Sequence, residues 1–389
     1  MKTKFELAGV IRRFGKDLFA KEKLSPDQTK ALWDILQCRT ATLGGHEQAC
    51  DCCGVIRYSY NSCGNRHCPK CQLAKQIKWI DQLMDRTLPV RHYHIVFTVP
   101  HCLNNICLWN DKLFYSILFD AMWRTLRSFG YTHYGVETGA VAVLHTWGQN
   151  LILHPHLHCL VPAAGYTLNC KWKNIGINGK YLYPVHQLSR AFKNKFLKSL
   201  DLALYKTGQL NDFSHCIDQA LKKEWVVYCE PSMADADHVI RYLGQYTHRV
   251  AISNQNIINI TDSHVQFIAK DYRDNAKKKP TKLTGVEFLR RFCQHVLPAR
   301  FVKIRYYGIY NATTKRSLQL QFVQPTIDDI HKQQIVKHET TAECLKRILD
   351  VDITLCPHCK QGIMHKIKEI PRIRSPNNHL PTLIYSLFQ

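Results

Sequence analysis

The feature that most constrains the fold is a pair of Cys-x-x-Cys motifs near the N-terminus of this 389-residue chain. Cys50 and Cys53 form the first motif, and Cys68 and Cys71 form the second. Each motif can sit on a tight turn that aims two thiolates at one ion, and two such turns complete the tetrahedral site that Zn²⁺ prefers. We therefore predict a structural Zn²⁺ site at these four cysteines, so that the N-terminal module folds by binding metal.

Nearby side chains leave the ligand set open. Replacement ligands, or ligands for a second site, are available at Cys52, Cys63, His46 and His67. A third motif, Cys356-x-x-Cys359, is half of a zinc site that His358, His365 or another segment could complete. The competing interpretation of these motifs is a set of thiols that bind no metal. A disulfide scaffold is not expected, because a chain of this length with 45% hydrophobic residues has enough core without one.

The net charge indicates a nucleic-acid partner. The chain carries a formal charge of +23 and has a pI near 9.4, which attracts phosphate backbones or anionic membranes. No apolar run approaches the roughly 20 residues of a membrane span. Met1–Phe19 is charged throughout and lacks the apolar segment of a signal peptide. We therefore expect a nucleic-acid-binding protein without a membrane partner.

Hydrophobic periodicity predicts an α+β fold. Alternation predicts a strand at His92–Val99, and two further strands at Gly139–Trp147 and His154–Val161 joined as an antiparallel hairpin. A short strand is expected at Trp225–Cys229. Helical spacing predicts helices at Lys75–Thr87, Asn110–Phe129, Gln187–Thr207 and Ala234–His248.

Three histidines on the second hairpin strand form a candidate metal site. Period-two spacing puts His154, His156 and His158 on one face, with neighbouring histidines about 6.6 Å apart along the backbone. His156 and His158 are the firmer ligand pair, because His154 and His158 would need a bent strand to share an ion. The third ligand is His154, or His145 across the hairpin, or Gln149. The competing interpretation is a polar face whose histidines are satisfied by hydrogen bonds.

A pair of tyrosines and a basic tract complete the candidate site residues. Spacing of four puts Tyr242 and Tyr246 on one face of a predicted helix, which by itself is more often packing than catalysis. Between Tyr272 and Arg316 there are twelve Lys or Arg residues against two acids, with aromatic residues interleaved. Cations that follow phosphates and rings that stack on unpaired bases suit single-stranded DNA. The DNA-contacting group expected there is Lys277, Lys278, Lys279, Arg290, Arg291 and Arg305.

With these motifs in hand, the chain resembles the HUH endonucleases, and more closely the rolling-circle transposases of the insertion sequence 91 family. His156-Leu157-His158 matches the histidine-hydrophobe-histidine motif, and Tyr242 with Tyr246 matches the two-tyrosine variant. The stretches SYNSCGNRHCPKCQ, LHTWGQNLILHPHLHCLV, YLGQYTHRVAISN and VKIRYYG occur in the order found in that family. The resemblance covers about residues 20–320.

The resemblance implies a three-part organisation. A zinc-ribbon-like N-terminal domain at 1–88 would precede an HUH endonuclease domain at 89–320, an antiparallel sheet flanked by helices. A C-terminal region with a Cys-x-x-Cys motif would occupy 321–389. Transposition of an insertion sequence would take place in the bacterial cytoplasm, associated with the nucleoid. The partner would be single-stranded DNA at element ends and target.

The resemblance also implies the chemistry. Tyr242 or Tyr246 would attack a phosphodiester and form a 5′-phosphotyrosine link, with a histidine-bound Mg²⁺ or Mn²⁺ as the catalytic metal. No nucleotide cofactor is expected, because the energy of the cleaved bond is kept in that link. The sequence has no phosphate-binding G-x-x-x-x-G-K-[ST] motif, which leaves a helicase of the host cell as a candidate partner.

Three other functions compete with this one. A plasmid replication initiator or relaxase would share the nicking chemistry. A zinc-dependent DNA-binding regulator would bind DNA without cutting it. A nuclease that uses metal-activated water would leave no covalent adduct.

Overall fold

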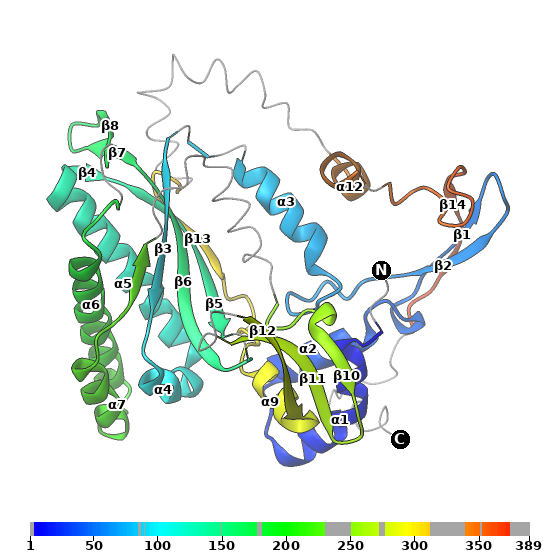
Figure 1. Cartoon of the computed structure of the whole chain (residues 1–389), viewed down its shortest axis with the longest axis horizontal. Coiled ribbons are helices and arrows are strands. Elements are labelled where there is room, and N and C mark those ends of the chain that lie inside the picture. The colour runs from blue at the N-terminus through cyan, green and yellow to red at the C-terminus, as the bar shows by residue number, and fades with distance from the viewer. Residues whose placement is uncertain are drawn as a thin grey trace.

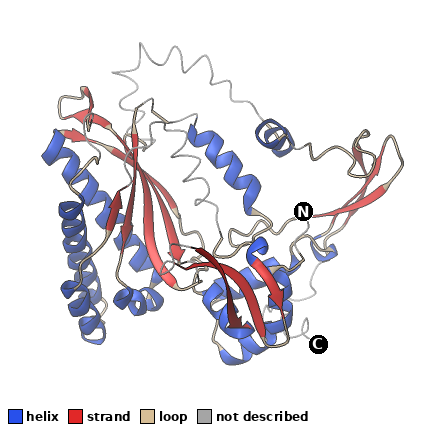
Figure 2. Cartoon of the chain, viewed as in Figure 1, coloured by secondary structure: helices blue, strands red, loops and turns tan. Residues whose placement is uncertain are grey.

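A computed structural model describes residues 4–84, 87–88, 90–148, 150–176, 181–229, 250–271, 277–311, 339–350 and 352–373 of the chain (Figures 1 and 2). Helices and antiparallel sheets are mixed along the chain, which confirms the predicted α+β class. No helix among these residues is long and apolar enough to cross a membrane.

A five-stranded antiparallel sheet forms the centre of the molecule, in the order β13-β5-β6-β3-β9. Its strands are β3 (His92–Thr98), β5 (Gly139–Trp147), β6 (Leu153–Pro162), β9 (Val227–Cys229) and β13 (Ile304–Gly308). The predicted hairpin is confirmed, since β5 pairs antiparallel with β6. Continuous apolar residues such as Val141–Leu144 fit a strand that is buried on both faces.

Helices cover one face of this sheet, as Figure 1 shows. They are α4 (Asn104–Trp109), α5 (Asp111–Phe129), α6 (Val185–Lys206) and α7 (Leu210–Lys222). Asn110 begins α5 by accepting a hydrogen bond from the Leu113 amide, and the apolar stripe Phe114, Leu118 and Met122 packs into the main core. On the opposite face, α3 (Gln72–Met84) contacts the sheet through Leu83. The hydrophobic core on that face has fewer buried residues than the main core.

The N-terminal helices share a second core with residues from much later in the chain. Helices α1 (Leu7–Lys21) and α2 (Pro26–Gln37) pack with a three-stranded sheet and helix α9. The sheet has the order β10-β11-β12, and the later elements are β10 (Ile257–Ile260), β11 (His264–Asp271), β12 (Lys277–Thr284) and α9 (Gly285–Cys293). Residues 250–296 therefore pack with the first forty residues, a contact that no local sequence pattern predicts.

Two small sheets and several short helices complete the fold. Strands β1 (Gly45–Cys50) and β2 (Ile56–Tyr60) pair with β14 (Met364–Ile370), and this small sheet projects away from the central sheet in Figure 1. The other small sheet consists of β4 (Val136–Glu137), β7 (Ala164–Thr167) and β8 (Trp172–Asn174). The remaining elements are α12 (Thr341–Leu349), η1 (Ala41–Leu43), η2 (His101–Leu103), η4 (Asn254–Asn256) and the π-helical turn η3 (Gly130–Tyr134).

The close approach of α9 to α1 provides a test of the shared core. A Cβ at Gly285 would overlap the ring of Phe14, which is buried in α1. We expect Gly285→Ala to lower the free energy of unfolding by about 1–3 kcal/mol, measured by urea denaturation, because the core must be overpacked. Gly9→Ala is the matched control on α1. Its Cβ would meet only Ile260 Cδ1 at 3.5 Å, so stability should hold or rise. Equal effects of the two changes would contradict this packing.

Candidate metal centre

Three histidines from β5 and β6 converge on the sheet face opposite α5 and α6. The antiparallel register places His145 directly opposite His156, and His158 follows His156 on the same face of β6. Ring centroids lie 5.3 Å apart for His145 and His156, 4.6 Å for His145 and His158, and 4.9 Å for His156 and His158. The ligand atoms of all three lie within 4.8 Å of one another, a spacing that one ion can span.

Hydrogen bonds hold two of these rings in orientations that suit metal binding. Nδ1 of His156 lies 2.6 Å from the backbone oxygen of His154, which can only accept, so this nitrogen carries the proton. Nε2 of His156 is then left with its lone pair. Nδ1 of His158 lies 2.9 Å from Nε2 of His94, a residue of β3. Outer hydrogen bonds of this kind fix the tautomer and orientation of metal-binding imidazoles.

Burial favours the neutral form of His156 and His158, the form in which an imidazole binds a metal. Desolvation lowers the pKa of His156 to about 4, and it lowers the pKa of His158 well below its usual value. His145 is 2% exposed and His158 is 7% exposed. The three residues therefore fit a divalent ion that accepts imidazole nitrogens, such as Mn²⁺.

His154 stands apart from this group. Its ring centroid lies 5.1 Å from those of both His101 and His156, but His154 is absent from the triad whose ligand atoms lie within 4.8 Å. The reason is geometric, because a residue directly across an antiparallel pair is closer than one four positions along the same strand. Of the three candidates for the third ligand, the structure brings His145 to the pair. Gln149 lies outside the described residues.

The proposed nucleophiles cannot be placed against the histidines. Tyr242, Tyr246 and the helix predicted at Ala234–His248 all lie outside the described residues. Their role therefore stays a prediction.

The basic residues predicted to contact DNA occupy three different settings. Lys277, Lys278 and Lys279 are exposed on β12. Arg290 and Arg291 of α9 both bind Glu287 at 2.6 Å, and the salt bridges lower the pKa of that carboxyl to about 2. Their DNA contacts stay predictions.

The two arginines also line a cavity of about 190 Å³ beside the histidine strand. Leu153 of β6, the residue before His154, also lines it, with Asn104 of α4. Arg305 is in a different place. It pairs with Ala142 in the sheet and lies over the ring of Phe119 at 4.1 Å, which puts it on the face opposite the histidines.

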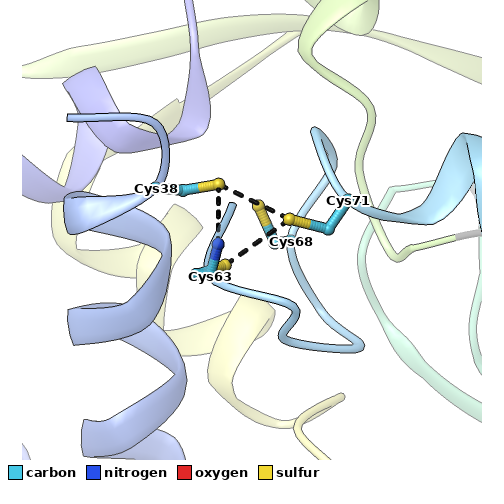
Figure 3. Close-up of side chains that lie close together, drawn as sticks. All are labelled: Cys38, Cys63, Cys68 and Cys71. Atoms are coloured by element: carbon cyan, nitrogen blue, oxygen red, sulfur yellow. Dashed lines mark hydrogen bonds between the residues drawn. The ribbon is translucent and has the colours of Figure 1, made fainter. Parts of the chain in front are cut away.

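Four cysteines meet where α2 ends and the loop before α3 begins, as Figure 3 shows. Cys38 follows α2, Cys63 follows β2, and Cys68 and Cys71 lie on a tight turn in which the Cys71 amide donates to the Cys68 carbonyl at 3.1 Å. The Sγ atoms of Cys38 and Cys71 lie 3.5 Å apart, and those of Cys63 and Cys71 lie 3.6 Å apart. Tetrahedral Zn–S bonds of about 2.3 Å would require about 3.8 Å between sulfurs, so this inner cysteine cluster fits Zn²⁺.

The prediction that Cys50 and Cys53 share a site with Cys68 and Cys71 is not what the structure shows. Cys50 and Cys53 lie at the tip of the β1–β2 hairpin, beside Cys356 and Cys359. The physical reason is that β2 lies between the two motifs and carries the chain away from the hairpin tip before Cys68 and Cys71. The places of Cys50 and Cys53 in the inner cluster are taken by Cys38 and Cys63.

Sequence reasoning overlooked some of these residues and left others as alternatives. Cys63 was among the replacement ligands, but Cys38 is an isolated cysteine at the end of a helix and carries no spacing signal. His94 alternates with His92 on a predicted strand, and that pattern was the available signal. The order of the strands in the sheet is set by the tertiary structure. Only that order shows that His94 reaches His158.

Comparisons with known proteins match two parts of the chain. Residues 10–99 match a family model described as "Transposase zinc-binding domain", and residues 139–317 match one described as "Putative transposase". The chain is 37% identical to "Putative transposase y4qJ" of Sinorhizobium fredii, over 95% of this chain and 97% of that protein.

A second relative is more distant. The chain is 26% identical to "Transposase for insertion sequence element IS801" of Pseudomonas savastanoi pv. phaseolicola, over 72% of this chain and 70% of that protein. No solved structure matches the chain. The zinc-binding model and the inner cysteine cluster together support structural zinc in the N-terminal part.

The inner cysteine cluster predicts a specific loss of zinc. We expect Cys63→Ser to lower the zinc content by one ion per chain and to lower the melting temperature, because a closed site contributes folding free energy. Elemental analysis and calorimetry measure both. Cys170→Ser is the control, since Cys170 is exposed and lies outside the cysteine clusters. Unchanged zinc in Cys63→Ser would remove this residue from the ligand set.

The histidine geometry predicts a graded effect on Mn²⁺ affinity. His145→Ala removes a ligand and should weaken binding most. His94→Ala removes the partner of His158 and should weaken it by roughly 10–100-fold, as loss of such partners usually does. His154→Ala should change it little. Titration calorimetry gives the order, and a larger loss from His154→Ala than from His145→Ala would exchange their roles.

Proposed function

The chain belongs to the transposases of the insertion sequence 91 and 801 type, and we propose that it nicks and rejoins single-stranded DNA through a 5′-phosphotyrosine intermediate during rolling-circle transposition. The observation that carries the proposal is the convergence of His145, His156 and His158 on one sheet face. Three imidazoles with ligand atoms this close can hold one divalent ion, and a metal-dependent DNA endonuclease needs such an ion at its active site.

In this proposal His145, His156 and His158 hold a catalytic Mg²⁺ or Mn²⁺, with imidazole ligands favouring Mn²⁺. When bound, the ion supplies positive charge that neutralises the phosphate and stabilises the departing 3′-oxygen. The protein's part is to orient the ligand rings. The carbonyl of His154 accepts a hydrogen bond from Nδ1 of His156, and Nε2 of His94 pairs with Nδ1 of His158.

The proposed nucleophiles are Tyr242 and Tyr246, carried over from the family's two-tyrosine motif. The phenol oxygen attacks phosphorus, the bond from phosphorus to the 3′-oxygen breaks, and the phenol proton is lost while the strand end becomes a 3′-hydroxyl. A free phenol has a pKa near 10, so the reaction needs an environment that favours the phenolate. Rejoining reverses the step and needs no nucleotide cofactor. A second tyrosine permits a second cleavage while the first link persists.

Single-stranded DNA would approach the histidines from the side of α9. The exposed Lys277, Lys278 and Lys279 supply charge there, and the cavity bordered by Arg290 and Arg291 adjoins the histidine strand. Phosphates would compete with Glu287 for the two arginines, because both guanidinium groups are engaged by that carboxylate. Arg305 has no support as a contact of this same strand, since it packs on the opposite sheet face. A host helicase remains a candidate partner that would supply the single strand.

The tyrosine proposal predicts a covalent adduct. We expect the wild-type chain, incubated with single-stranded element ends and Mn²⁺, to form a protein–DNA species that survives denaturing electrophoresis. The Tyr242→Phe/Tyr246→Phe double variant should form none. Phenylalanine keeps the ring, so the free energy of unfolding should fall by no more than the loss of a hydrogen bond causes, about 1 kcal/mol per tyrosine.

Two other outcomes would separate the competing functions. Cleavage without an adduct in the wild-type chain would indicate a nuclease that uses water. Binding without cleavage would indicate a DNA-binding regulator. An adduct formed at full yield by the double variant would contradict the assignment of Tyr242 and Tyr246 as nucleophiles.

A further inference from the structure

A sheet built from both ends of the chain carries the second group of cysteines. Strand β1 pairs antiparallel with β2 on one side and with β14 on the other, so that Cys50 faces Met364 across the ladder. The two Cys-x-x-Cys turns extend from the same end of this sheet. One belongs to the hairpin of β1 and β2, and the other precedes β14.

The two turns have the same backbone geometry. In the first, the Gly54 amide donates to the Cys50 carbonyl at 3.1 Å, and in the second the Lys360 amide donates to the Cys356 carbonyl at 2.9 Å. Gly54 has φ +69° and Lys360 has φ +58°, so each turn closes with a left-handed residue directly after its second cysteine. A lysine in that conformation is disfavoured, and the surrounding structure must hold it there.

Backbone amides also point at the sulfur atoms. The Cys53 amide donates to Cys50 Sγ at 3.5 Å, and the Gly362 amide donates to Cys359 Sγ at 3.3 Å. Such donors stabilise thiolates, the form in which cysteine binds a metal. A Cβ on Gly362 would lie 2.5 Å from Cys50 Sγ, so the two turns approach as closely as a glycine allows.

The sulfur positions match a tetrahedral metal site. Cys50 Sγ lies 3.6 Å from Cys359 Sγ, and Cys53 Sγ lies 3.8 Å from Cys356 Sγ. All four sulfurs lie within 4.8 Å of one another. The Zn–S bond length predicts about 3.8 Å between sulfurs, whereas a disulfide would bring them to about 2.05 Å.

The small sheet has almost no hydrophobic core of its own. The buried apolar residues that group here among the described residues are Cys50, Cys356 and Met364. Other large apolar side chains of the sheet, such as Tyr58 and Ile367, are more than half exposed. Three short strands without a core need another source of stability, and a structural metal is one such source in a module of this size.

We propose that Cys50, Cys53, Cys356 and Cys359 bind a second structural Zn²⁺, which joins the N-terminal hairpin to a segment about three hundred residues later in the chain. This outer cysteine cluster takes half of its ligands from outside residues 10–99, the range matched by the zinc-binding model. It goes beyond the proposed DNA chemistry and does not depend on it. The ion makes the C-terminal segment a part of the N-terminal module.

Zinc content tests the proposal directly. The purified full-length chain should contain two zinc ions, and the Cys356→Ser/Cys359→Ser variant should contain one. Cys52→Ser is the matched control, because Cys52 lies in the first turn but outside the cluster, and it should retain two. One ion in the wild-type chain, two ions in the double variant, or none in the double variant would each overturn the proposal.

Hydrogen exchange provides a second measurement that reports on the sheet itself. Amides in the β1–β14 ladder should lose protection in the double variant, while amides of β5 and β6 keep theirs. If the ladder stays protected without the two cysteines, the ion does not join the two segments. Cadmium NMR of the metal-exchanged chain should likewise show two signals typical of four sulfur ligands, with one lost in the double variant.

Discussion

The register between β5 and β6 determines the histidine site. A shift of one residue would move every side chain of the strand to the opposite face. That face packs Leu144, Leu157 and Cys159 against α5 and α6, and all three are buried. A shifted register would place imidazoles in the core and leucines outside it. Such a shift is unfavourable, because burying a large apolar side chain contributes about 1.5–3 kcal/mol. The hydrophobic face of the sheet thus fixes the geometry of the polar one.

The inner cysteine cluster contacts the same sheet through the loop between Cys63 and Cys68. Arg66 donates to the Phe301 carbonyl at 2.5 Å, and His67 Nε2 accepts from the Leu297 amide at 3.3 Å. Residues 297–301 lead into β13, which pairs with β5, the strand that carries His145. Burial lowers the pKa of His67 to about 3, so it stays neutral and keeps accepting this bond near neutral pH. The zinc-binding part and the sheet are therefore packed as neighbours, with direct polar contacts between them.

Individual strands and helices could be predicted from the sequence, whereas the contacts between distant segments largely could not. Alternation along His154–Val161 and the turn before it were enough to predict the β5–β6 hairpin, and that hairpin brings His145 to His156 and His158. Local spacing could not show that Cys38 joins Cys68, because they are separated by a hairpin. Nor could it show that Cys50 meets Cys359, because the pairing of β1 with β14 is decided by tertiary structure. Sequence motifs supplied ligand types and half-sites, and packing chose the partners.

The pairing of β1 with β14 has a consequence for synthesis of the chain. At roughly 5–20 residues per second, the ribosome would add the final strand about 15–60 seconds after the hairpin has been made. During that interval the edge of β1 that later pairs with β14 has no partner from its own chain, and the thiols of Cys50 and Cys53 lack Cys356 and Cys359. An unpaired strand edge is a template for association with other chains. Chains released before residue 359 would therefore keep an unpaired strand edge that favours association with other chains.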